Sequence, residues 1–260
     1  IDHYPICIEK YRITLDVIER AKNDPIEIQR AKILAETAER MPIAIADDEL
    51  IVGIGASKPM GLEIDPHYGI WSRDEIDSLI EDGYLMDSQD VEELMELNEK
   101  HDPSTMIGLM GDIFYEPENN HILSLLKAGI ILPQWKDKNE GKGVGGGYAQ
   151  SGLGLGPSLF LLGVDYSKLL KLGTEGIIQR AEEELQKIKF YDKDGVEKFR
   201  YYKAVIISFK AIERLAERYS KLAAEMAINE KDEKRKNELI QISQICSNVP
   251  KKPASNFREA

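Results

Sequence analysis

Apolar side chains recur at helical intervals along most of this chain. In residues 8–22 and again in residues 25–40 they stand three or four positions apart, which predicts two antiparallel helices. Pro25 fits the first turn of the second helix, because the N–H that proline lacks has no partner there. The fold class predicted for this chain is therefore mainly α.

The middle of the chain continues this pattern in shorter segments. Four short amphipathic helices are predicted at residues 73–81, 88–99, 104–114 and 118–128. Before them, the run from Glu49 to Gly53 is short, favours β structure and is stopped by glycine. We predict a strand or an extended segment there.

The last third is more regular. Seven apolar positions alternate four and three residues apart and form one seam along a long helix: Val205, Phe209, Ile212, Ala216, Tyr219, Ala223 and Met226. We expect this helix to pack within the chain, whereas a coiled-coil dimer would need the seam exposed. A further helix over residues 231–246 should end before Val249-Pro250. Residues 253–260 place a proline and a capping residue before helix formers, as if another helix begins there.

Charge and composition exclude some classes of partner. The formal net charge is −12, and the basic residues are spread out, so nucleic acid is not expected as a partner. No apolar run is long enough to cross a bilayer, and we expect a cytoplasmic protein without a membrane association. Cys7 and Cys246 lie far apart without metal-binding spacing and are expected to be reduced, structural thiols.

Conventional catalytic arrangements are absent from the sequence. The four histidines are scattered without metal-ligand spacing: His3, His67, His101 and His121. Most carboxylates lie beside basic residues on helix faces and are expected to be solvated. Neither an acid–base pair nor a metal site can be assigned from spacing.

The most unusual stretch is residues 141–163, which holds nine of the chain's twenty glycines. A GxGxxG match at Gly141 lacks a preceding strand, and no lysine followed by Ser or Thr completes a P-loop, so we predict no nucleotide site. One interpretation is a mobile surface loop. The apolar side chains between Tyr148 and Leu162 favour a buried loop that lines a pocket.

Several motifs, in order, resemble glycyl-radical enzymes of the pyruvate formate-lyase-like family. They extend over the whole chain and comprise Ile8–Arg12, Ile28–Leu34, Asp48–Gly53, Ala56–Pro59, Asp165–Leu170, Gly176–Ile178, Val249-Pro250 and Phe257–Ala260. The resemblance implies that residues 1–260 are the N-terminal, helical part of a ten-stranded α/β barrel domain. The C-terminal barrel portion and the glycyl-radical domain would then be absent.

The resemblance also implies a chemistry that this part of the chain cannot perform alone. In the family a glycyl radical oxidises a cysteine to a thiyl radical, and that cysteine stands in a Gly-Cys-x-Glu setting. Neither Cys7, in Ile-Cys-Ile, nor Cys246, in Ile-Cys-Ser, has this setting. The family implies no bound cofactor, a radical S-adenosylmethionine activase as partner, a small-molecule substrate and a homodimer.

The glycine-rich segment gives an expectation about the substrate. The run Tyr148–Ser158 resembles the arylacetate decarboxylase branch, whose members act on indoleacetate or phenylacetate. Family dehydratases often have a Gly-His pair where this chain has Phe160-Leu161, and an apolar wall would leave a diol hydroxyl unpaired at a cost of roughly 1–3 kcal/mol. The expected substrate-binding residues are Tyr148, Gln150, Ser151, Ser158, Phe160 and Leu161.

Two alternatives remain open. A glycyl-radical dehydratase, or a lyase for carbon–carbon or carbon–heteroatom bonds, would share nearly all of these motifs. A non-catalytic helical interaction module would instead be complete in these 260 residues.

Overall fold

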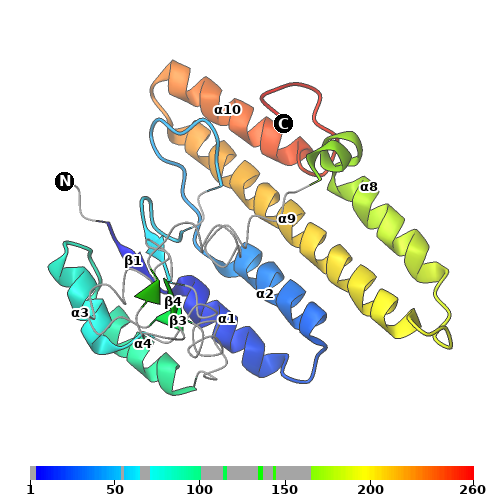
Figure 1. The fold of residues 1–260 in the computed structure, drawn as a ribbon. Helices are drawn as coiled ribbons and strands as arrows, with labels where there is room; N and C mark the ends of the chain where they lie inside the picture. Colours follow the sequence, from blue (N-terminus) through cyan, green and yellow to red (C-terminus); the bar gives the residue numbers. More distant parts are fainter. Residues whose placement is uncertain are drawn as a thin grey trace. The chain divides into compact units, whose positions relative to one another are not determined.

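Helices dominate this chain, as the sequence predicts. The computed structural model describes residues 4–53, 56–64, 71–100, 114–115, 134–136, 143–144 and 165–260. Within these ranges it has seven helices, and every strand is two or three residues long (Figure 1). The residues form two compact units, one of residues 1–15 and 60–164 and the other of residues 16–59 and 165–260.

The first unit contains two small sheets and two helices. Strand β1 (Ile6–Cys7) pairs in parallel with β2 (Leu62–Glu63), with Ile6 opposite Leu62. The second sheet is antiparallel in the order β3-β4-β5, from Phe114–Tyr115, Gln134–Lys136 and Gly143–Val144. Helix α1 (Glu9–Arg20) begins in this unit, which also holds α3 (Arg73–Glu81) and α4 (Ser88–Lys100).

Local sequence explains where α3 begins and how the first unit is packed. The Ser72 hydroxyl accepts from the Glu75 N–H, and the Glu75 carboxylate accepts from the Ser72 N–H at 2.7 Å, which together form a capping box. The largest fully buried apolar side chains of this unit are Ile6, Ile8, Tyr11, Ile64, Trp71, Ile76, Leu79 and Leu94. They come from β1, α1, the segment after β2, α3 and α4, so the core ties these elements together.

The second unit is a helical layer built around one long helix. Helix α9 (Gly195–Asn229) packs against α2 (Ile26–Arg40), α8 (Tyr166–Gln186) and α10 (Glu233–Asn248), as Figure 1 shows. One core cluster joins α9 to α10 and to Ile45, and another joins α9 to α8 through Ile178, Ala181 and Ile206. The prediction that this helix packs within the chain is confirmed. The prediction of one apolar seam along this helix is incomplete, because α9 contacts three helices and Ile212 of the predicted seam is 39% exposed.

Most of the other predicted helices are present in the structure. The predictions for residues 8–22, 25–40, 73–81, 88–99 and 231–246 correspond to α1, α2, α3, α4 and α10. Residues 49–53 form no strand; they run through bends, and Ile51 is 87% exposed. Residues 253–260 form a turn in which the Asn256 side chain accepts from the N–H groups of Arg258 and Glu259. The predictions for 104–114 and 118–128 lie outside the described ranges.

Helix α8 is broken at Gly173, which the sequence pattern did not predict. Gly173 has φ +62° and ψ 177°, which are not helical angles. The first helical segment of α8 therefore ends at Gly173, and a second segment begins after it. The N–H groups of Thr174 and Glu175 donate to the carbonyls of Pro250 and Lys251 at 2.8 and 3.2 Å. A side chain at position 173 would collide with the backbone of Lys251 and Lys252.

We expect Gly173→Ala to destabilise the protein by more than Gly53→Ala. Both glycines have positive φ, but a methyl group at Gly53 meets no atom within 4 Å, whereas one at Gly173 meets backbone. Gly53→Ala should therefore cost only backbone strain, about 1–2 kcal/mol, and Gly173→Ala should cost about 3 kcal/mol or more. Urea unfolding of the two variants measures the difference. Equal losses would show that the contact with residues 251–252 is not tight.

Candidate functional site

The substrate-binding residues expected from the sequence lie outside the described residues, as do the four histidines. This applies to Tyr148, Gln150, Ser151, Ser158, Phe160 and Leu161. Their role therefore stays a prediction. Chemistry-bearing side chains within the described ranges gather at two other places, one in each unit.

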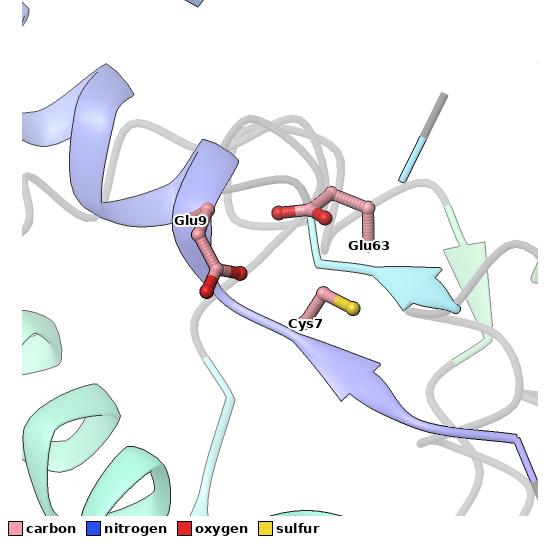
Figure 2. A group of neighbouring side chains, drawn as sticks. All are labelled: Cys7, Glu9 and Glu63. Atoms are coloured by element: carbon pink, nitrogen blue, oxygen red, sulfur yellow. The ribbon is translucent and has the colours of Figure 1, made fainter. Parts of the chain in front are cut away.

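In the first unit, a thiol and two carboxylates meet where β1, β2 and α1 come together. Cys7 ends β1, Glu9 begins α1, and Glu63 lies opposite Cys7 in the parallel pair (Figure 2). One ligand-type atom from each residue lies within 4.8 Å of the others. Cys7 is fully buried, while the two glutamates are half-buried. Sequence reasoning missed this group, because Glu63 and Cys7 are distant in sequence and share no motif.

The contacts of this group give it a structural role. A Glu63 carboxylate oxygen accepts from the Lys10 N–H at 2.7 Å, at the first turn of α1. A carboxylate at a helix N-terminus accepts from an N–H that has no partner within the helix. Its negative charge is also attracted to the positive end of the helix dipole. The Cys7 thiol faces the Pro5 carbonyl, with Sγ 4.0 Å from the oxygen. One sulfur and two carboxylates could also hold a divalent transition metal, but Glu63 is already used as a helix cap.

Helix α1 is also joined to α4 by an ion pair. Arg12 donates from Nε and Nη2 to the two Glu93 oxygens at 2.5 and 2.7 Å. This hydrogen bonding lowers the pKa of Glu93 and raises that of Arg12. Nearby, the buried Tyr11 hydroxyl donates to Asn98 at 2.7 Å, and burial raises the pKa of Tyr11. These groups fix α1 against α4 and keep Tyr11 a neutral phenol.

In the second unit, an apolar cleft of about 260 Å³ lies among α8, α9, α10 and the last residues. Its lining is mainly aliphatic and includes Leu169, Leu215 and Val249. Cys246, on α10, also lines it and is half-buried. Burial raises the pKa of the Cys246 thiol, so the thiol stays protonated near neutral pH. Both cysteines are free thiols, as predicted, and Cys7 lies in strand β1.

Comparison with known proteins places these elements in a family. The model of the family described as pyruvate formate lyase-like matches residues 2–260. A probable dehydratase, YbiW of Escherichia coli, is 26% identical over 98% of this chain and 29% of its own length. The isethionate sulfite-lyase of Oleidesulfovibrio alaskensis is 26% identical over 98% of this chain and 30% of its own length.

The solved structures agree with the sequence relatives. The glycerol-bound, B12-independent glycerol dehydratase of Clostridium butyricum is 27% identical, with a TM-score of 0.73 over 99% of this chain and 30% of that one. The chain therefore belongs to the pyruvate formate lyase-like family, whose relatives found here are glycyl-radical lyases and dehydratases. It spans about three tenths of the length of the relatives that it matches. No described helix is long and apolar enough to cross a membrane.

We expect Glu63→Gln to destabilise α1 without affecting a metal site. Glutamine keeps an acceptor oxygen but loses the charge that favours the helix N-terminus, which should cost about 0.5–1 kcal/mol. The matched control is Glu19→Gln, which removes a charge from the last turn of the same helix and should be neutral or slightly stabilising. Urea unfolding checks both. Stabilisation of the wild type by added Mn²⁺ that is lost in Glu63→Gln would instead show a metal site, and an unchanged unfolding midpoint in Glu63→Gln would contradict the capping role.

We expect Cys246→Ala in the complete enzyme to lower stability and leave turnover unchanged. The half-buried thiol packs on the α9–α10 core, and its removal should cost about 1 kcal/mol. The measurements are the unfolding midpoint, the yield of glycyl radical by electron paramagnetic resonance, and the turnover rate. Loss of turnover with normal folding and radical yield would give Cys246 a catalytic role.

Proposed function

We propose that the full-length protein is a glycyl-radical lyase that removes a hydroxyl or sulfonate group from a small organic substrate. The observation that carries this proposal is the match of the family model to residues 2–260 together with the kind of relative found. Those relatives include a probable dehydratase, a glycerol dehydratase and an isethionate sulfite-lyase. These names share one kind of reaction, the removal of water or sulfite from a substrate.

In this proposal residues 1–260 are the N-terminal part of the catalytic domain and not the centre of reaction. The protein-borne glycyl radical, when installed by a radical S-adenosylmethionine activase, supplies hydrogen abstraction through a cysteine in the remaining portion of the enzyme. The described residues contribute rigid packing: α9 with its three neighbours in one unit, and α1 fixed against α4 in the other. The complete enzyme is proposed to be a homodimer that binds a small molecule.

A substrate panel tests the reaction class. The complete, activated enzyme would be assayed without oxygen on isethionate, glycerol and phenylacetate. Release of sulfite from isethionate, or of an aldehyde from glycerol, is the expected result. Release of carbon dioxide from phenylacetate, with no reaction of the other two, would overturn the proposal in favour of a decarboxylase.

Arylacetate decarboxylation is the second candidate, and one observation favours it. The run Tyr148–Ser158 resembles the decarboxylase branch, and the adjacent Phe160-Leu161 pair offers an apolar surface suited to an aromatic ring. The tyrosine, glutamine and serine side chains of the run would donate hydrogen bonds to a carboxylate or to the loop itself. In this reading the segment from Tyr148 to Leu161 forms one wall of the substrate pocket.

Substitution of Leu161 separates the two candidates. If an aromatic ring packs on Leu161, Leu161→Ala removes a contact of about 1–2 kcal/mol and raises KM for an arylacetate roughly five- to thirtyfold. Leu161→His should instead favour a diol by supplying a hydrogen-bonding side chain. Steady-state kinetics of both variants on both substrate classes measure this. Unchanged kinetics throughout would place the segment outside the pocket.

A further inference from the structure

The loop between α8 and α9 exposes aromatic side chains to a degree found at few other places in the described chain. We define the tip as residues 187–203. Phe190 and Tyr191 are 62% and 82% exposed, and Tyr201 is 60% exposed. The Phe190 and Phe199 rings lie 5.4 Å apart, so the tip presents a preformed aromatic surface. Exposed aromatic groups of this size are typical of interaction surfaces.

The tip is ordered by its own backbone contacts. Asp192 N–H donates to the Lys189 carbonyl and Gly195 N–H to the Asp192 carbonyl, both at 3.0 Å, which makes two successive turns. Gly195 is buried, and a Cβ there would collide with Lys189. The backbone that carries Phe190 and Tyr191 is therefore ordered, which reduces the backbone entropy that a partner's binding would cost.

The tip also has the opposite charge from the rest of the chain. Residues 187–203 hold six basic and three acidic residues, in a chain of formal net charge −12. Lys187 and Lys198 pair with carboxylates of the same unit, at 2.7 Å each. Lys193 and Arg200 have no ion pair with any described residue, and Lys203 lies over the Phe199 ring. A basic, aromatic surface of this kind complements an acidic one.

A strongly acidic segment of the described chain is the α3–α4 hairpin, defined here as residues 73–100. It holds eleven acidic residues and two basic ones. On α3, Asp74, Asp77 and Glu81 are exposed and follow a helical repeat along one face. On α4, Glu92, Glu96 and Glu99 do the same. Arg73 pairs with Glu92 at 2.7 Å and Arg12 of α1 pairs with Glu93, and the hairpin still holds far more acidic than basic side chains.

We propose that the tip of one chain docks on the α3–α4 hairpin of a second copy of this chain. Each copy carries both surfaces, so one copy can supply the tip and the other the hairpin. The aromatic side chains supply apolar burial, and the cations Lys193 and Arg200 meet carboxylates such as Asp77 and Glu81. This inference rests on the proposal of a homodimer, and it adds the surface that makes it.

Charge exchange in the full-length protein tests the docking. The tip variant is Lys193→Glu with Arg200→Glu, the hairpin variant is Asp77→Lys with Glu81→Lys, and a third protein carries all four changes. The control is Lys234→Glu, on an α10 side chain that is 87% exposed and belongs to neither surface. Sedimentation equilibrium at low and high salt measures the dimer dissociation constant, and circular dichroism verifies folding of each variant.

We expect the tip and hairpin variants each to weaken the dimer about tenfold or more, with a loss of salt dependence, because two attractive charge pairs become repulsive. The four-fold exchange should return the dissociation constant to within about threefold of the wild type, and Lys234→Glu should leave it unchanged. Tyr191→Ser should weaken the dimer equally at low and high salt.

Three results would overturn the docking. A monomeric wild type would remove the homodimer itself, whatever reaction the enzyme catalyses. An unchanged dissociation constant in the tip and hairpin variants would place the dimer contact elsewhere. Weakening by both variants without recovery in the four-fold exchange would mean that each surface meets a different partner, such as the remaining portion of the enzyme.

Discussion

The packing of α9 against three other helices is the constraint on which the second unit depends. Helix α9 has 35 residues, and most of the stability of a helix in a protein comes from burying its apolar side chains against neighbours. Small residues make this close contact possible, since Ala211, Ala223 and Ala227 are nearly fully buried on α9. Tyr219 fills the larger space toward Leu239 and Ile242 of α10. Loss of α9 would therefore expose α2, α8 and α10 together.

Two arginines extend this helical layer to the irregular segment after α2. Arg218 donates to the carbonyls of Ala38 and Met41 at 2.5 and 2.7 Å, where α2 ends. Arg235 donates to the carbonyls of Ala46 and Glu49 at 2.7 and 3.0 Å. Carbonyl groups that would otherwise need a neighbouring strand are thus satisfied by side chains from α9 and α10. Within the β-favouring residues 49–53, the Glu49 carbonyl is bound in this way by a side chain and not by a neighbouring strand.

The sequence predicted what depends on local periodicity and missed what depends on distant partners. Helices α1 to α4 and α10 follow from apolar spacing, and the start of α2 also from Pro25. The predicted strand at residues 49–53 is wrong, and the Glu49 carbonyl there is bound by Arg235, which lies 186 positions away. The meeting of Cys7 with Glu63 likewise required the register of β1 on β2. The six substrate-binding residues between Tyr148 and Leu161 remain a prediction from resemblance, because none lies within the described residues.

The break in α8 shows how one residue can direct the chain far from it. In an unbroken helix each interior N–H donates to a carbonyl of the same helix. The positive φ of Gly173 starts a new helical segment, and the first N–H groups of that segment have no partner within the helix. Those of Thr174 and Glu175 bind residues 250 and 251, and Lys252 pairs with the Glu175 carboxylate. The buried Thr174 hydroxyl donates to Glu213 on α9 at 2.5 Å. A single glycine therefore joins α8, α9 and the segment after α10, and so fixes the path of the chain that follows α10.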